Sequence, residues 1–149
     1  MKVPMRVDYG VRALVELADH YGSGPVQTAE IATRQAIPQA YLDQLLTILH
    51  KYGLISSRRG PSGGHMLAKN PSEISLWMVM STLEGNTPSM DCLIAPNECT
   101  LSVCCPQRSI WQTVDEAIQE LLSSTSIADL LARQYTMAAQ GRAQTATAA

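Results

Sequence analysis

The sequence predicts a mainly α-helical fold, in which a winged helix-turn-helix is followed by a long C-terminal helix. Three short helical patterns precede two strand-like runs around a connection rich in Gly and Pro, which is the element order of a winged helix-turn-helix. A strong apolar stripe of helical spacing follows near the C-terminus. The length of 149 residues suits one domain, or a small domain with an extension.

Apolar spacing and turn residues mark the first three helices. The first stripe consists of Val7, Val11, Leu14, Ala18 and Tyr21. The segment YGSGP (21–25) ends that helix, and a second helix is expected from Thr28 to about Arg34. Pro38 closes the turn QAIP and suits the first turn of a third helix. The buried stripe of the third helix is expected at Leu42, Leu45, Leu46 and Leu49.

A β-hairpin is expected next, because the runs LISS (54–57) and HMLA (65–68) flank the connection RRGPSGG. Asn70-Pro71-Ser72 interrupts the chain, and a fourth helix is expected from Ile74 to about Leu83. We therefore assign residues 1–83 to a DNA-binding domain of the winged helix-turn-helix class.

The remainder of the chain divides into three segments. All four cysteines lie in an irregular loop at residues 84–107. Helices are expected over residues 108–136, where Ser126-Ile-Ala-Asp129 resembles a capping box that restarts a helix. Residues 137–149 have no apolar period, so we expect a disordered tail. The stripe that marks the long helix consists of Ile110, Val114, Ala117, Ile118, Leu121 and Leu122.

Composition limits the location and the partners. The N-terminus MKVPMRVDYG has no apolar signal region, and no run approaches ~18 apolar residues, so we expect a cytoplasmic protein with no membrane span and with reduced thiols. The net charge of −2 argues against nucleic-acid binding. However, residues 1–70 carry eight basic against five acidic residues, and residues 71–149 carry three against eight. This asymmetry favours a front half that meets phosphate.

Side chains on the third helix and the hairpin predict contact with DNA. Outside its leucine stripe, the third helix carries Gln39, Ala40, Tyr41, Asp43, Gln44, Thr47 and Lys51. Gln can form two hydrogen bonds with one adenine, Asp can accept a hydrogen bond from the amino group of cytosine, and Lys can bind phosphate. The hairpin tip SSRRGPSGGH adds two arginines and several glycines, which suit a close approach to a backbone or a narrow minor groove. The alternative is that these residues are ordinary solvated polar groups and turn formers.

The cysteine spacing C-x6-C-x5-C at Cys92, Cys99 and Cys105, with Cys104 beside the last, predicts a metal or redox function. A zinc ribbon usually offers C-x2-C pairs, which are missing, and the adjacent cysteines suit an ordinary disulfide poorly. Three thiolates on a loose loop suit an iron–sulfur cluster, which needs a fourth ligand from elsewhere. A thiol redox switch and a zinc site remain alternatives.

Three stretches resemble the Rrf-two family of transcription regulators, whose cluster-binding members are IscR-like, NsrR-like and RirA-like. They are MRVDYGVRALVELA, YLDQLLTILHKYGLISSRRGPSGGHMLAK, and the three-cysteine loop followed by SIW before a long helix. The resemblance covers about residues 1–135. It implies a winged-helix homodimer in which the long helix after the cysteine loop makes most of the dimer contact.

The resemblance also implies a ligand set. Cys92, Cys99 and Cys105 match the three cysteines of the family. IscR-like members place a histidine three residues after the last cysteine, but this chain has Arg108, which has no lone pair to donate. NsrR-like members use an N-terminal aspartate from the partner subunit, and Asp8 stands at that position. This set favours a 4Fe-4S cluster over a 2Fe-2S cluster. The alternative for Asp8 is a solvated carboxylate near Arg12.

The resemblance carries over a set of DNA-binding residues, which are Gln39, Ala40, Tyr41, Asp43, Gln44, Arg59, Gly60, Gly63 and Gly64. We add Thr28, Lys51 and Arg58 to the predicted DNA-binding residues. Arg59 matches the wing arginine that enters the minor groove. Asp43 stands where IscR-like members often have the longer Glu, so the preferred bases are expected to differ.

The sequence therefore predicts a homodimeric DNA-binding regulator of a palindromic promoter site, controlled by an iron–sulfur cluster. Iron homeostasis, cluster assembly or oxidative and nitrosative stress is the expected context. The alternatives are a cluster-free thiol-switch regulator and an iron–sulfur carrier or electron-transfer protein. An enzyme is least favoured, because His20, His50 and His65 lie far from the cysteines and near no evident nucleophile.

Overall fold

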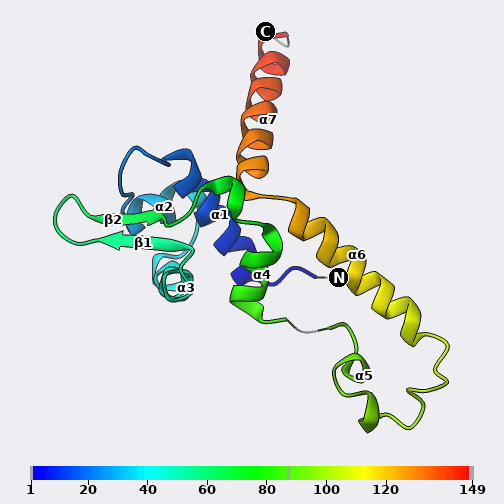
Figure 1. The fold of residues 1–149 in the computed structure, drawn as a ribbon. Coiled ribbons are helices and arrows are strands. Elements are labelled where there is room, and N and C mark those ends of the chain that lie inside the picture. The colour runs from blue at the N-terminus through cyan, green and yellow to red at the C-terminus, as the bar shows by residue number, and fades with distance from the viewer. Residues whose placement is uncertain (1, 87, 148–149) are drawn as a thin grey trace.

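The computed structural model describes residues 2–86 and 88–147 and has three parts (Figure 1). A winged-helix body is followed by an arm, which consists of the cysteine loop and α6, and by the projecting helix α7. The elements are α1 (Met5–Asp19), α2 (Thr28–Gln35), α3 (Gln39–Lys51), β1 (Ile55–Arg58), β2 (Gly64–Leu67), a 3-10 helix (Pro71–Glu73), α4 (Leu76–Glu84), α5 (Asp91–Ile94), a second 3-10 helix (Pro96–Glu98), α6 (Arg108–Ser124) and α7 (Ile127–Thr147). This order confirms the predicted winged helix-turn-helix.

Helix α1 lies at the centre of the body. It packs against α2 and α3 on one side and against α4 and α7 on the other. Ala13 and Leu14 are therefore fully buried, as are Leu42 and Leu49 of the predicted α3 stripe. Among the described residues, no helix has the length and apolar character needed to cross a membrane.

A buried carboxylate joins α1 to the helix-turn-helix. Glu16 of α1 is 6% exposed and accepts hydrogen bonds from Arg34 Nη1 and Gln35 Nε2, both at 2.8 Å. The chain then turns at Ala36, which has a left-handed φ of 52°, and its N–H bonds to the carbonyl of Ala32. Because a buried charge must be paired, this network fixes the end of α2 against α1.

The wing is an antiparallel hairpin that is tied back to the start of the helix-turn-helix. Strands β1 and β2 pair from Ile55 opposite Leu67 to Arg58 opposite Gly64. His65 of β2 also exchanges two backbone hydrogen bonds with Val26, at 2.9 and 2.8 Å. This bridge sets the position of the wing relative to α2.

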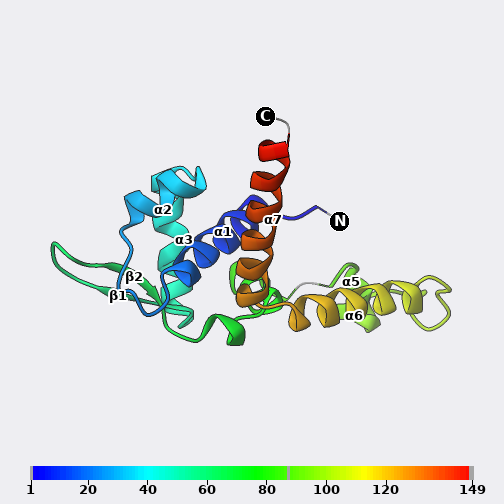
Figure 2. The ribbon, with the colours of Figure 1, turned by 90° about the horizontal axis from the view of Figure 1, so that it is seen from above.

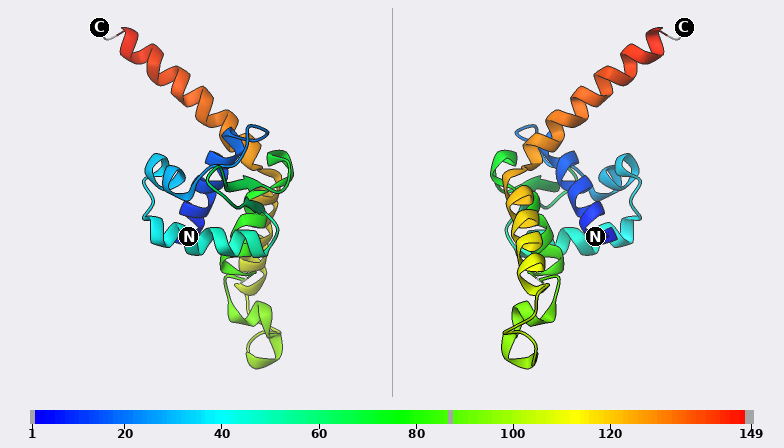
Figure 3. Two further views of the ribbon diagram at one scale, coloured as in Figure 1. Left: turned by 90° about the vertical axis from the view of Figure 1, so that its left-hand side faces the viewer. Right: turned by 90° about the vertical axis from the view of Figure 1, so that its right-hand side faces the viewer.

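The connection between α6 and α7 is held by the capping box that the sequence predicts. Asp129 accepts hydrogen bonds from the Ser126 backbone N–H and hydroxyl, and the Asp129 N–H bonds back to the Ser126 hydroxyl. These bonds lower the pKa of the Asp129 carboxyl. Ile127 is fully buried in the body, whereas α6 has no buried residue. Figures 2 and 3 show the arm and α7 leaving the body in different directions.

Two expectations differ from the structure. The cysteine loop is not wholly irregular, because it contains α5 and a short 3-10 helix. The tail expected to be disordered from residue 137 instead continues α7 to Thr147, and residues 148 and 149 lie outside the described residues. The segment MAAQGRAQ contains one Gly but is otherwise made of Met, Ala, Gln and Arg, whose high helix propensity extends an existing helix without an apolar period.

The wing bridge generates a stability prediction. Gly64 has φ +148°, and a Cβ placed there overlaps the carbonyl group of Val26. Gly64→Ala should therefore lower the free energy of unfolding by about 2–4 kcal/mol in urea melts followed by circular dichroism. Gly60→Ala is the control, because Gly60 has φ +107° but nothing within 4 Å of the added atom. Equal losses in the two variants would show that the bridge contributes little.

Candidate nucleic-acid interface and cysteine loop

The predicted reading residues lie together on the exposed face of α3. The leucine stripe turns inward to the core, which leaves the other residues in solvent. The exposed residues of α3 are Gln39, Ala40, Tyr41, Asp43, Gln44, Thr47, His50 and Lys51. The helix thus presents a continuous polar face, as expected of a helix that enters a major groove.

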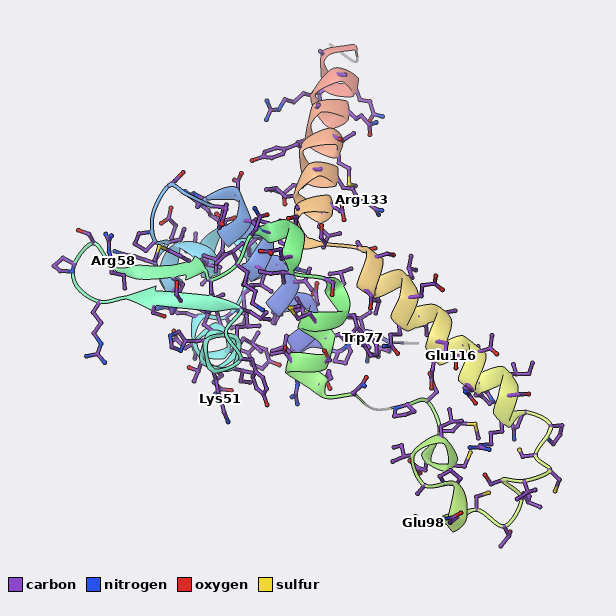
Figure 4. All side chains as sticks on the ribbon, viewed as in Figure 1. Lys51, Arg58, Trp77, Glu98, Glu116 and Arg133 are labelled. Atoms are coloured by element: carbon purple, nitrogen blue, oxygen red, sulfur yellow. The ribbon has the colours of Figure 1, made fainter. Side chains whose placement is uncertain are left out.

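The wing tip places its arginines at the edge of the same face. Arg58 Nη2 donates to the Ser62 carbonyl at 3.2 Å, which closes the tip. Gly63 packs against the Arg58 carbonyl so closely that a side chain there overlaps it. Arg59 is exposed and extends from the adjacent position. Figure 4 shows Arg58 and Lys51 on the same side of the body, far from Glu98 in the cysteine loop.

A cleft of about 420 Å³ separates α3 from the wing. It is lined by Asp43, Leu46, Thr47, His50, Ser57, Arg59 and His65. The sequence assigned no role to His65 or Ser57. The Gly63-Gly64 pair in the sequence predicts that another backbone segment approaches the wing closely. Only the fold shows that the segment beside Gly64 is the one before α2, at Val26.

The ring of His65 connects two segments beside this cleft. Its Nε2 lies 3.1 Å from Thr28 Oγ1, at the start of α2, and its Nδ1 lies 3.1 Å from Ser57 Oγ in β1. Burial lowers the pKa of His65, Asp43 raises it, and His50 lowers it further. The predicted contact residue Thr28 therefore belongs to the same hydrogen-bonded unit as the wing.

Asp8 is paired within its own helix. Arg12 donates to its two oxygens from Nε at 3.1 Å and from Nη2 at 2.9 Å. The same guanidinium lies 5.6 Å from the ring of Tyr9, and Tyr9 contacts Tyr41 edge-on with ring centres 5.7 Å apart. A third contact of Arg12 reaches the Gln35 carbonyl at 3.4 Å. Asp8 is thus two contacts away from the end of α2 and three contacts away from the recognition helix α3.

The cysteines lie at the distal end of the arm, opposite the wing (Figures 1 and 2). Cys92 is in α5, Cys99 follows the second 3-10 helix, and Cys105 precedes α6. All four thiols are free, and these three are half-buried whereas Cys104 is exposed. Within residues 2–86 and 88–147, no three His, Cys, Asp or Glu side chains are close enough to hold a metal ion. The structure therefore does not bring Asp8 and the cysteines together within one chain.

The start of the cysteine loop is attached to α6, and α4 packs against the same helix. Ser89 donates to Asp115 of α6 through its backbone N–H at 2.9 Å and through its hydroxyl. Trp77 of α4 and Ile118 of α6 line a neighbouring hollow, and Figure 4 shows Trp77 between the two helices. The arm is thus fixed to the body near α4, while the cysteines lie beyond this contact.

Apolar side chains remain exposed along α6. Ile110 is 63% exposed and Leu121 is 66% exposed, on the stripe that the sequence predicts. A second apolar surface is a groove of about 210 Å³ between α1, α4, α6 and α7. The groove is lined by Val3, Val7, Asp8, Val11, Leu76, Met80, Leu122 and Leu130. Contiguous apolar surface of this kind marks an interaction site.

Comparison with known families matches residues 3–133 to Rrf2, described as an iron-dependent transcriptional regulator. The chain belongs to the Rrf2 (Rrf-two) family. It is therefore a DNA-binding transcription regulator of the helix-turn-helix type, as the exposed face of α3 indicates.

Named members of the Rrf2 family are similar over most of the chain. The regulator IscR of Pectobacterium atrosepticum is 31% identical over 147 residues, which cover 99% of this chain and 89% of that protein. The solved structure of T. potens IscR has a TM-score of 0.72 at 35% identity and covers 90% of this chain and 88% of its own. The structure of CymR, the global cysteine regulator of B. subtilis, has a TM-score of 0.77 at 29% identity, with 89% and 98% covered.

Proposed function

We propose that this Rrf2 regulator is a cytoplasmic homodimer whose promoter affinity is set by an iron–sulfur cluster. The observation that carries the proposal is the set of three half-buried thiols, Cys92, Cys99 and Cys105, on one loop of a DNA-binding regulator. The context that the resemblance implies is iron homeostasis, cluster assembly or oxidative and nitrosative stress. The similarity to IscR over nearly the whole chain supports this reading.

The donor set suits a cluster by its chemistry. Soft thiolates select iron–sulfur clusters, and a carboxylate is a hard ligand that holds iron more weakly. Cys104 is exposed and adjacent to Cys105, so we exclude it from the set. Since Arg108 has no lone pair, we propose Asp8 as the fourth ligand, and a 4Fe-4S cluster rather than a 2Fe-2S cluster. The loop has to close around the cluster, so binding and ordering of the loop are coupled.

A dimer is required if Asp8 serves as a ligand. Asp8 lies in the groove beside α1, and the cysteines lie at the far end of the arm. The exposed stripe on α6 supports pairing with the same helix of a second copy, which brings one subunit's loop toward the other subunit's α1. The two winged-helix domains of the dimer then bind a palindromic site, because operator symmetry mirrors protein symmetry.

The Asp8–Arg12 pair connects the proposed cluster ligand Asp8 to the recognition helix α3. Once Asp8 turns to the cluster, Arg12 loses its carboxylate partner. Arg12 also contacts Tyr9 and the end of α2, and Tyr9 contacts Tyr41 on α3. The two states of the Asp8 carboxylate therefore favour different arrangements of the recognition helix, and the cluster shifts their populations by its differential affinity.

A second candidate is a thiol redox switch without iron. The likeness to CymR, a global cysteine regulator, and the exposed Cys104 beside Cys105 favour it. In this case the loop responds to oxidation while the DNA-reading face is the same. An iron–sulfur carrier is disfavoured, because a carrier has no need of the exposed reading face on α3.

The cluster proposal predicts different outcomes for neighbouring thiols. Anaerobically prepared protein should be brown and contain iron and sulfide, and Cys105→Ala should lose them. Cys104→Ala, the matched control, should keep the same absorption spectrum. Asp8→Ala should lose iron on the order of tenfold faster in air without a change in the thermal unfolding midpoint. A colourless wild-type protein after reconstitution would favour the thiol switch instead.

The reading face predicts a phosphate contact at Arg59. Arg59→Ala should weaken binding to all sequences by roughly tenfold and reduce the slope of log affinity against log salt by about 0.9, because one phosphate contact is lost. Fluorescence anisotropy at several salt concentrations measures both. Arg133→Ala removes the same charge from α7, which Figure 4 shows far from the wing, and should leave the slope unchanged. An unchanged slope in Arg59→Ala would remove this residue from the interface.

The exposed stripe predicts the effect of a charge on assembly. Leu121→Glu should raise the dimer dissociation constant by at least about thirtyfold, because it places a carboxylate in an apolar contact. Sedimentation equilibrium measures this constant. Gln112→Glu adds the same charge on the opposite face of α6 and serves as the control. A Leu121→Glu variant that stays fully dimeric would exclude α6 as the main dimer contact.

A further inference from the structure

The cleft between α3 and the wing faces a DNA strand when both parts are engaged. A helix in the major groove and a hairpin tip in the neighbouring minor groove are separated by one sugar–phosphate backbone. That backbone passes over the space between α3 and β1. This step rests on the proposed DNA-reading surface and extends it to His65 and Ser57, which the sequence did not single out.

His65 and Ser57 line the cleft, and the hydroxyl of Thr28 lies behind them, against the other nitrogen of the His65 ring. The ring of His65 spans Thr28 Oγ1 and Ser57 Oγ, each at 3.1 Å. The backbone bridge between His65 and Val26 holds the ring in place. Both hydroxyls belong to segments at the DNA-facing side, namely the start of α2 and the wing strand β1.

The protonation state of this ring decides how many donors the cleft offers. A neutral imidazole has one N–H and one bare nitrogen, whichever tautomer is present. One of the two hydroxyls must therefore donate its hydrogen bond to the bare nitrogen of the ring. A protonated imidazole has two N–H groups, so both hydroxyls accept from the ring and both hydroxyl protons are free to point outward. Phosphate oxygens only accept hydrogen bonds, so the protonated state suits them better.

The charges around the ring set the direction of the effect. Burial lowers the pKa of His65 in the free protein, Asp43 of α3 raises it, and His50 of α3 lowers it. Arg59 of the wing also lines the cleft and carries a fixed positive charge. A phosphate in the cleft raises the pKa of His65. Because the pKa is higher in the complex than in the free protein, DNA binding takes up a proton and affinity rises as the pH falls.

We propose that His65 is a proton-linked positioning residue, which turns the hydroxyls of Thr28 and Ser57 toward a DNA backbone phosphate when its ring is protonated. DNA binding by this regulator is then coupled to pH through the wing, independently of the cysteine loop.

The test measures DNA affinity against pH. Full-length, anaerobically prepared protein is titrated into a fluorescent duplex of about 30 base pairs of mixed sequence at low salt, where phosphate contacts dominate. Affinity of the wild type should rise roughly fivefold from about pH 8 to about pH 6. His65→Gln should give a flat profile, because an amide can bridge both hydroxyls but does not titrate. Ser57→Ala should lose about half of the rise on a logarithmic scale.

His50→Gln tests the competing explanation, in which an exposed histidine on α3 meets the phosphate directly. It should keep a pH-dependent rise of the wild-type size, displaced to higher pH because His50 no longer lowers the pKa of His65. In addition, the NMR titration of the His65 ring should move to higher pH when DNA is added, which a purely structural residue would not show. Thermal unfolding of each variant reports whether the fold is intact.

The outcomes separate the two proposals. A wild type that binds no duplex at any pH overturns the DNA-reading surface and with it the role of His65. A wild type that binds equally at all pH values, or a His65→Gln variant that keeps the rise, overturns the role of His65 alone. A flat profile in His50→Gln with a normal rise in His65→Gln would show that His50 takes up the proton on DNA binding, and this result also overturns the role of His65.

Discussion

Burial of α1 is the constraint on which the rest of the molecule depends. A helix packed on both sides needs apolar residues around most of its circumference, and Ala13, Leu14 and Leu17 meet this need with almost no exposed surface. The recognition helix lies on one side of α1, and α4, which carries the arm, lies on the other. Close-packed interiors transmit displacement because they have no room to absorb it. The recognition helix and the arm are therefore mechanically connected through α1 and through the direct contact between α3 and α4.

The DNA-facing surface is assembled from three chain segments. The segment at the start of α2 and the wing hairpin meet at His65, through one backbone bridge and the contact with Thr28, and α3 faces His65 across the cleft. With a net charge of −2, the chain has few cations with which to attract DNA. The placement of these cations consequently matters more for DNA binding than in a strongly basic protein.

The arm has a different physical character from the body. Helix α6 buries no residue, and Val103 in the cysteine loop is 99% exposed. Such a segment gains little from burying its own apolar surface, so its order has to come from other contacts. Ser89 and Asp115 hold one end of the loop to α6. The proposed dimer contact and the proposed cluster ligands both lie on the remaining exposed surface of the arm.

Local patterns in the sequence determined the helices, the hairpin, the capping box at Ser126 and the inward direction of the α3 leucines, because each depends on spacing within a few residues. The sequence offered the nearness of Arg12 to Asp8, four positions apart, only as the alternative to a ligand role for Asp8, and the structure pairs the two side chains. The helical tail from residue 137 was not predicted from the sequence. An apolar period indicates a packed helix, whereas this end of α7 forms through helix propensity alone. Only the tertiary structure decided that Arg34 pairs with Glu16 and that His65 meets Thr28 and Ser57. Thr28 and His65 are 37 positions apart in the sequence. A hydrogen bond between them forms only once the fold has brought both groups together.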